Sequence, residues 1–147
     1  MAARKRYLFA CVATVFGAGF MLGSTARGTS VVQAQSANRV FELRTYTTPE
    51  GKLDDLQAGF RDNTMRLFER HGMTNVGYWT PQDAPNSSNT LVYIVAHNSR
   101  EAAETSWQNF RDDPDWQRAS RESQANGRIV DNIESVFLDP TDYSPMQ

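Results

Sequence analysis

The chain has 147 residues with 15 basic and 17 acidic side chains, a formal net charge of -2, which indicates one small domain. Residues 1–34 hold four of the basic residues and no acidic one, so the remainder has 11 basic and 17 acidic residues and a net charge of -6. Because phosphate binding depends on clustered Lys and Arg, this acidic remainder argues against nucleic acid and anionic membrane surfaces as partners.

The N-terminal segment, residues 1–34, predicts export. It begins "MAARKRYLFACVATVFGAGFMLG", in which basic side chains precede an apolar run over residues 8–23. Val32 and Ala34 supply the small side chains that a signal peptidase requires, so we expect cleavage after Ala34. The mature domain, residues 35–147, would then lie in the periplasm or outside the cell. The alternative is an uncleaved N-terminal helix as the only membrane contact, although the run is shorter than the ~20 residues that span a bilayer.

A strand is predicted over residues 39–47, "RVFELRTYT", because this stretch is rich in Val, Phe, Tyr and Thr and ends before Pro49. Side chains of a strand alternate between two faces, so Glu42, Arg44 and Tyr46 share one face. Three polar or amphipathic side chains aligned in this way form a candidate site.

A helix is predicted over residues 49–71, where apolar side chains recur at helical spacing and form one buried stripe. We expect Thr48 to cap its first turn and Gly72 to end it. Two further strands follow, over residues 73–80 and 90–97. The polar connector between them, residues 81–89, is longer than an ordinary hairpin loop, so we predict that it is mobile or shaped by a contact.

The second helix begins after Ser99 and is predicted to break at the stretch "DDPD". Pro114 lacks an amide hydrogen and favours extended backbone at Asp113, so one helix cannot continue through this pair. The same pair suits a helix restart over residues 114–124, with Asp113 as N-cap and Asp115 favoured by the helix dipole. The turn would bring three aromatic side chains together: Trp107, Phe110 and Trp116.

A last strand is predicted over residues 127–139, followed by an irregular tail at 140–147. The order strand, helix, strand, strand, helix, strand predicts an α+β fold of the ferredoxin-like βαββαβ type. Its four-stranded antiparallel sheet would carry both helices on one face, with the second helix broken at Pro114.

The second face of this sheet is predicted to need a partner. The strand at 90–97 is apolar on both faces, and residues 136–138 are three consecutive apolar residues. A chain of this size buries only about 65% of its unfolded surface on its own. Because an open apolar sheet face exceeds what a monomer normally exposes, we expect a homodimer with its two sheets packed face to face.

The candidate site is a pocket between those two sheets. If the strands at 39–47 and 90–97 are neighbours, a carboxylate, a guanidinium, a phenol and an imidazole line one cavity, where burial shifts pKa values. The expected ligand is a small apolar or aromatic molecule. A simpler interpretation pairs Glu42 with Arg44 at the rim of the dimer and leaves His97 in solvent. The predicted lining residues are Glu42, Arg44, Tyr46, Trp79, Tyr93 and His97.

Metal-binding patterns are weak in this sequence. The single cysteine, Cys11, lies in the N-terminal apolar run, so the mature domain has no thiol for a disulfide bond. His71 and His97 fall in different predicted elements and do not show the spacing of a zinc site. The acidic residues at 112–115 are explained better by helix capping, and we expect no metal and no cofactor.

Four segments of the chain resemble the NIPSNAP family: "FELRTYTTPEGKLDDL", "HGMTNVGYW", "LVYIVAHNSREAAETSWQNFRDDPDWQRASRES" and "IESVFLDPTDYSP". They cover nearly all of residues 40–145 and are most specific at "ELRTYT", "WQNFRDDPDW" and "PTDYSP". The resemblance implies a dimeric α/β-barrel fold, in agreement with the dimer expected above. It supplies no catalytic residues, and bacterial members of the family mostly lack an assigned activity.

Two classes of function follow from the sequence. The first is an exported, homodimeric NIPSNAP-type module that binds a small molecule or a protein without covalent chemistry of its own. The alternative, by analogy of fold, is a cofactor-independent monooxygenase lined by Tyr46, Trp79, Glu42 and His97, with His97 as the base. Haem binding through His97 is a third hypothesis and predicts a Soret band on titration.

Overall fold

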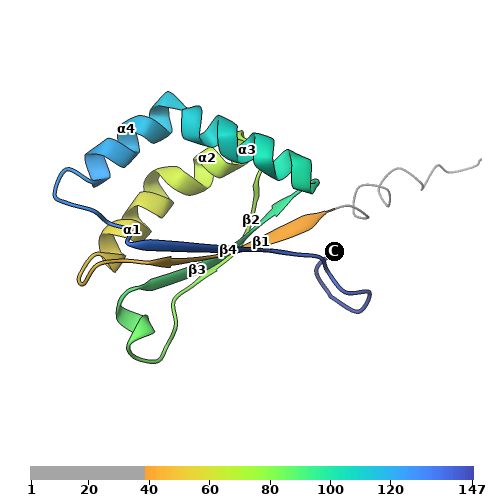
Figure 1. Cartoon of the computed structure of the whole chain (residues 1–147), viewed down its shortest axis with the longest axis horizontal. Helices are drawn as coiled ribbons and strands as arrows, with labels where there is room; N and C mark the ends of the chain where they lie inside the picture. The colour runs from red at the N-terminus through yellow and green to blue at the C-terminus, as the bar shows by residue number, and fades with distance from the viewer. Residues whose placement is uncertain (1–38) are drawn as a thin grey trace, which may run out of the picture.

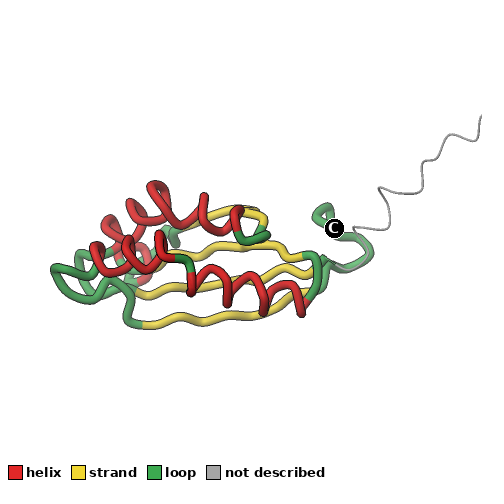
Figure 2. The backbone as a smooth tube through the Cα atoms, turned by 90° about the horizontal axis from the view of Figure 1, so that it is seen from above, coloured by secondary structure: helices red, strands yellow, loops and turns green. Residues whose placement is uncertain are grey.

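A computed structural model describes residues 39–147, so the predicted leader, its cleavage site and Cys11 lie outside the described residues. The chain forms one sheet of four antiparallel strands in the order β2-β3-β1-β4. The α-helices all cover the same face of this sheet (Figures 1 and 2). The predicted ferredoxin-like fold is therefore confirmed. The strands are β1 (Val40–Thr47), β2 (Thr74–Trp79), β3 (Thr90–His97) and β4 (Asn132–Leu138).

The central strand β1 sets the register of the sheet. Arg44 lies opposite Tyr93 of β3 and Ser135 of β4, and Glu42 lies opposite Val95 on one side. Residues directly opposite each other in an antiparallel pair share a face. The polar row of β1 therefore shares its face with Tyr93, which confirms that the strands of the candidate site are neighbours.

The first helical run begins later than predicted. The α-helix α1 (Leu53–Gly59) starts after a turn in which Gly51 adopts a φ of 73°, a left-handed conformation that favours glycine. Thr48 is not the cap of this helix, because its hydroxyl donates to the carbonyl of Asn89 at 3.3 Å and fixes the end of the connector instead. The predicted Thr48 cap is wrong for this reason.

The same helical run widens in its middle, which the sequence did not predict. A π-helical segment, Phe60–Thr64, separates α1 from α2 (Met65–Arg70), and the Thr64 hydroxyl donates to the Gly59 carbonyl five residues earlier at 3.2 Å. Such segments are rare in proteins, and those that do occur are often found at functional sites. The run ends as predicted at Gly72, whose φ is 80°.

The second helix breaks and restarts at the predicted place. The helices are α3 (Arg100–Asp112) and α4 (Pro114–Ser123), and Asp113 between them has the extended φ and ψ of -65° and 121°. Its carboxylate accepts a hydrogen bond from the amide of Asp115 at 2.7 Å, which confirms the predicted cap. The predicted aromatic group also forms, with the ring of Phe110 at 5.8 Å from Trp107 and 4.5 Å from Trp116.

The hydrophobic core lies between the helices and the sheet. Tyr93 stands at its centre, fully buried, with the ring of Phe60 at 5.2 Å and that of Tyr46 at 5.3 Å. Aromatic pairs at these distances and tilted orientations are favourable beyond the burial of their surface. The face of β3 that carries Leu91, Tyr93 and Val95 is therefore the face that the helices cover.

The connecting segments differ modestly from expectation. The connector after β2 contains a short 3-10 helix, Asn86–Ser88. The carbonyl of the next residue, Asn89, accepts a hydrogen bond from the amide of Thr48 at 2.8 Å. The final strand begins at Asn132 rather than 127, and Asp131 before it donates its amide to the carbonyl of Thr47 at 2.8 Å. The tail after β4 is irregular, as predicted.

No α-helix covers the other face of the sheet in the part of the chain that the structure describes (Figure 1). Many of its side chains are apolar, and several of these are half-buried or exposed, which agrees with the predicted apolar second face. Its polar side chains include Thr45 and Glu134, and its Phe41 and Ala96 are buried. We call this surface the open face; it includes Leu43, Trp79, Val92, Ile94, Val136 and Leu138. Within residues 39–147, no helix is both long enough and apolar enough to cross a membrane.

Candidate functional site

Glu42 is the centre of a buried polar cluster. The residue is 1% exposed, and its carboxylate receives four hydrogen bonds from side chains of three different strands and one helix. A carboxylate has about four acceptor positions, so this set uses them all. The donors are Arg44 at 2.7 Å, Ser135 at 2.6 Å, Trp107 at 2.6 Å and His97 at 3.0 Å.

The cluster keeps Glu42 ionised. Burial by itself would raise the pKa of this carboxyl group, but hydrogen bonds from His97, Ser135 and Trp107, together with the charge of Arg44, lower the pKa to about 2. The charge of Glu42 is therefore balanced by Arg44 within the cluster.

Arg44 connects this cluster to the aromatic core. Its guanidinium carbon lies 4.2 Å from the centre of the Trp107 ring and 5.5 Å from that of Tyr46, distances at which a cation is attracted to a ring. Its Nη2 also donates to the hydroxyl of Tyr46 at 3.4 Å. Arg44 thus holds Tyr46 in place beside the charged cluster.

The predicted pocket between two sheets is wrong for these residues. Glu42, Arg44, Tyr46, Tyr93 and His97 all point toward the helices of their own chain, because they share the face of β3 that the core covers. The simpler interpretation also fails for His97. That residue is 1% exposed, its Nε2 faces Glu42, and its Nδ1 has no hydrogen-bond partner within residues 39–147.

A cavity of about 220 Å³ lies next to this cluster, between the first helical run, α4 and one end of β1 and β4. Tyr46 lines it and also contacts Arg44, so this residue connects the two features. No charged side chain lines the cavity among the described residues. Its aromatic walls are Tyr46, Phe60, Phe68, Phe110 and Trp116, and its polar lining residues are Asn63, Thr64, Ser120, Ser123 and Gln124.

Most of these cavity residues were not predicted from the sequence to line a site. Ser120 and Ser123 follow Trp116 at helical spacing, so the amphipathic pattern of the restarted helix carried a usable signal. Asn63 and Thr64 belong to the π-helical segment, which no local pattern indicated.

Among the predicted site residues, Trp79 lies farthest from the polar cluster and the cavity in the strand order of the sheet. It belongs to β2, and its partner in register is Val92, so it faces the open face and not the cavity. Its ring lies over Gly77, where an added Cβ would come within 2.5 Å of the ring. The predicted grouping of Trp79 with Tyr46 and His97 is therefore wrong.

The comparison with protein families identifies the chain. A family model described as NIPSNAP matches residues 41–145, which include the whole polar cluster and the cavity. The chain belongs to the NIPSNAP family. A search of curated proteins found no match.

Solved structures of other NIPSNAP proteins share the fold of this domain. A NIPSNAP family protein with unknown function from Agrobacterium tumefaciens is 21% identical, covers 75% of this chain and 95% of its own, and gives a TM-score of 0.65. A NIPSNAP-like domain protein from Burkholderia xenovorans is 17% identical, with coverages of 74% and 90% and a TM-score of 0.64. At these identities the likeness establishes the fold alone.

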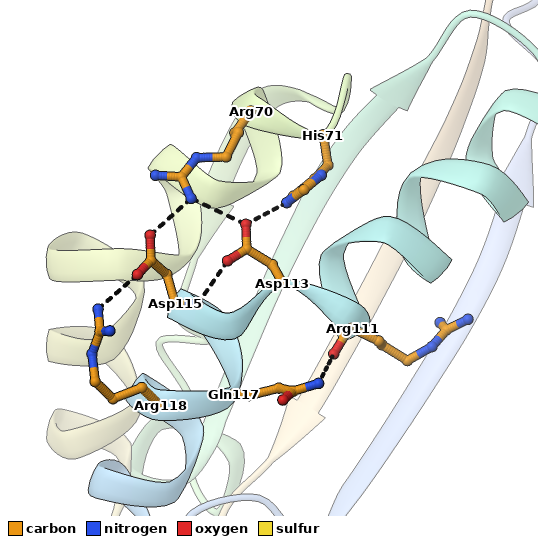
Figure 3. A network of polar contacts seen from close by, with 7 residues as sticks. All are labelled: Arg70, His71, Arg111, Asp113, Asp115, Gln117 and Arg118. Atoms are coloured by element: carbon orange, nitrogen blue, oxygen red, sulfur yellow. Dashed lines mark hydrogen bonds and ion pairs between the residues drawn. The ribbon is translucent and has the colours of Figure 1, made fainter.

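A second polar cluster in this NIPSNAP domain has a structural role (Figure 3). Asp113 accepts hydrogen bonds from His71 at 2.7 Å and from Arg70 at 3.1 Å, and Arg70 also reaches Asp115 at 2.9 Å. The hydrogen bond from His71 and the contacts from Asp115 and Arg70 outweigh desolvation and lower the pKa of Asp113 to about 2. The cluster joins the end of α2 to the start of α4, so the break at Pro114 serves the shape of the domain.

The geometry favours neither metal nor haem binding by the described residues. Within residues 39–147, no three His, Cys, Asp or Glu side chains gather in a way that could hold a metal ion. His97 is buried with its Nε2 directed at Glu42, so its ring is not presented to an iron centre.

Proposed function

We propose that this NIPSNAP domain is a homodimeric binding module that takes one small, neutral aromatic or apolar molecule in the cavity of each subunit. The observation that carries the proposal is the chemistry of the cavity wall, which has five aromatic rings and no charged side chain among the described residues. Ligand sites are typically apolar hollows with a few polar groups that orient the ligand.

The size of the cavity limits the ligand. An apolar cavity of roughly 150 Å³ can hold benzene, so about 220 Å³ suits a molecule of one or two fused rings. Asn63, Ser120 and Gln124 offer amide and hydroxyl groups to a hydroxyl or carbonyl group on that molecule. A charged ligand would lose its hydration without meeting an opposite charge, so a neutral one is favoured.

Binding is favoured over the alternative of proton chemistry. A general base must lie within hydrogen-bond reach of the proton that it removes. Glu42 and His97 do not line the cavity and are hydrogen-bonded to each other, and Trp79 faces the other side of the sheet. Of the four residues in the monooxygenase hypothesis, Tyr46 alone borders the cavity.

The open face supports the proposed homodimer. Val136 and Leu138 of β4 and Trp79 of β2 are 52%, 39% and 51% exposed on a surface that also contains the half-buried Val92 and Ile94. A second copy of the chain would cover these side chains through a symmetric contact of the same face with itself. The binding cavity lies on the opposite side of the sheet and stays complete in each subunit.

We further propose that the module acts outside the cytoplasm, in the periplasm or beyond it, after removal of residues 1–34. The support is the basic and apolar leader followed by Val32 and Ala34. Mass spectrometry of the protein from its native host tests this: we expect a mature chain beginning at Gln35, whereas an intact leader would indicate an anchored protein.

Calorimetric titration tests the ligand class, with neutral 2-naphthol and charged 2-naphthoate as probes of equal ring size. We expect saturable binding of 2-naphthol and at least tenfold weaker binding of 2-naphthoate. The variant Ala119→Leu places a larger side chain at the cavity wall and should weaken 2-naphthol binding at least tenfold.

The matched control is Glu122→Leu, an exposed position on the same helix that does not line the cavity. This control should bind 2-naphthol as the wild type does. Equal binding of both probes, or equal binding by both variants, would place the ligand elsewhere and contradict the proposal.

A further inference from the structure

A second hollow lies on the helix-covered side of the sheet, beside the binding cavity. It has a volume of about 320 Å³ and is bordered by the first helical run and by one end of β2 and β3. We call it the side hollow. Among the described residues, Phe60 is shared by the linings of the side hollow and the binding cavity. The other residues that line the side hollow include Gln57, Arg61, Met65, Tyr78 and Leu91.

The sheet residues under the two spaces are direct neighbours. Tyr46 of β1 lines the cavity and Leu91 of β3 lines the side hollow, and these two residues lie opposite each other in the sheet. On the other side of β1, Tyr46 lies opposite Ile133 of β4, which also lines the cavity. Because opposite residues of an antiparallel pair have Cβ atoms about 5 Å apart, the side hollow continues the line of the cavity across the sheet.

The first helical run forms the opposite wall of both spaces. Gln57, Arg61 and Met65 are four residues apart, so they lie on one flank of the run, where they line the side hollow. Asn63 and Thr64 line the cavity instead. The cavity and the side hollow therefore lie between the same helical run and the same row of sheet residues, on either side of Phe60.

The ring of Phe60 separates the two spaces. Phe60 is 6% exposed, and its ring centre lies 6.0 Å from that of Tyr46, which lines the cavity, and 5.7 Å from that of Tyr78, which lines the side hollow. Both contacts have the favourable edge-to-face geometry, so the ring is held from both sides. Its backbone begins the π-helical segment Phe60–Thr64, a widened turn of a kind often found at functional sites. One side chain thus closes the cavity toward the side hollow.

We propose that Phe60 is the residue that sets the length of the ligand. Its ring ends the cavity after one or two fused rings, and a longer ligand would enter the side hollow if a smaller side chain stood at this position. Met65, Tyr78 and Leu91 offer apolar contacts to the body of such a ligand. This inference rests on the proposed function, because it takes the cavity as the ligand site. It adds the residue that selects ligands by size.

The first test compares two neutral phenols by calorimetric titration of the full chain: 2-naphthol, with two fused rings, and 2-anthrol, with three rings in a line. The wild type should bind 2-anthrol at least tenfold more weakly than 2-naphthol. Phe60→Ala should bind 2-anthrol at least as tightly as 2-naphthol. Because Phe60→Ala removes a buried ring and lowers stability, Phe60→Leu is the second variant and should shift the ratio of the two affinities at least threefold in the same direction.

The controls are Leu56→Ala and Leu91→Ala, which shorten side chains that are each 4% exposed. Leu56 lines only the cavity and Leu91 only the side hollow, so both variants keep the Phe60 ring between the two spaces and should keep the wild-type ratio. A Leu56→Ala variant that accepts 2-anthrol as well as Phe60→Ala does would overturn the inference. An unchanged ratio in the Phe60 variants would also overturn it and leave the proposed function standing, provided that 2-naphthol binds. A wild type that binds neither phenol would contradict both.

The second test locates the longer ligand by NMR of isotope-labelled methionine methyl groups. Met65 lines the side hollow and not the cavity, and Met146 lines neither space and serves as the reference. In Phe60→Ala, 2-anthrol should shift the Met65 resonance, because an aromatic ring then lies beside this methyl group. In the wild type, 2-naphthol should leave the resonance in place. Bound 2-anthrol that does not move the Met65 resonance of Phe60→Ala would overturn the inference.

Discussion

At the scale of single residues, Glu42 is the central side chain of the buried polar cluster. It is a carboxylate under the helices with all of its acceptor positions used by Arg44, Ser135, Trp107 and His97. A buried charge is tolerated when it is paired and hydrogen-bonded, and its partners then become strongly coupled to folding. Glu42 is therefore a structural anchor of β1, β3, β4 and α3, beside the cavity.

The lowered pKa of Glu42 predicts a specific acid sensitivity. Its pKa is about 2 in the folded chain against 4.5 for a free side chain, so it contributes stability that is complete above pH 4.5 and lost as the pH falls toward 2. The contribution is on the order of 3 kcal/mol. Denaturant unfolding from pH 7 to pH 2 should show this loss in the wild type and not in Glu42→Gln.

The control for this measurement is Glu104→Gln, an exposed position of α3 on the helix side of the sheet. It should keep the acid sensitivity of the wild type. If Glu42→Gln unfolds with the same pH dependence as the wild type, Glu42 does not hold the charge that we assign to it.

At the scale of elements, the restarted helix shapes the cavity. The break between α3 and α4 turns Trp116, Ser120 and Ser123 toward the first helical run, where the π-helical segment supplies Phe60 and Asn63. The cluster around Asp113 fixes this turn by joining α4 to the end of α2 (Figure 3). The cavity therefore depends on a contact that lies outside it.

Removal of this cap should loosen both the fold and the cavity. In Asp113→Ala the amide of Asp115 and the side chain of His71 lose their acceptor, and Arg70 keeps only Asp115. We therefore expect a melting temperature several degrees lower and weaker binding of 2-naphthol. Asp112→Ala, one residue earlier on the exposed side of α3, is the matched control. Equal melting temperatures for the two variants would contradict the assigned role of Asp113.

The sequence predicted a strand or a helix boundary correctly where a few neighbouring residues determine its conformation. The alternation in β1, the run of β-branched and aromatic residues in β3 and the Asp113-Pro114 pair act over a few residues, so these strands and the helix restart were predicted correctly. The covered face of the sheet could not be predicted, because β3 offers Leu91, Tyr93 and Val95 on one side and Val92, Ile94 and Ala96 on the other. Only the packing of Phe60 and Phe68 against Tyr93 selects between these two sets. The π-helical segment likewise has no local signature.

At the scale of the whole molecule, the two faces of the sheet have separate tasks. The helix-covered face contains the polar cluster and the binding cavity, and the open face is proposed to hold a second copy (Figures 1 and 2). This separation has a direct consequence. Ligand binding should survive the loss of the dimer, since the cavity lies between the helices and the sheet, on the side opposite the open face.

The variant Val136→Asp tests this separation by placing a charge on the open face, at a position that is 52% exposed and does not line the cavity. Burying an unpaired carboxylate between two sheets is strongly unfavourable, so the variant should be monomeric. Native mass spectrometry with 2-naphthol is the most direct measurement. We predict two ligands on the wild-type dimer and one on the Val136→Asp monomer with unchanged affinity, whereas a folded monomer that no longer binds would place the ligand between the subunits and contradict the account.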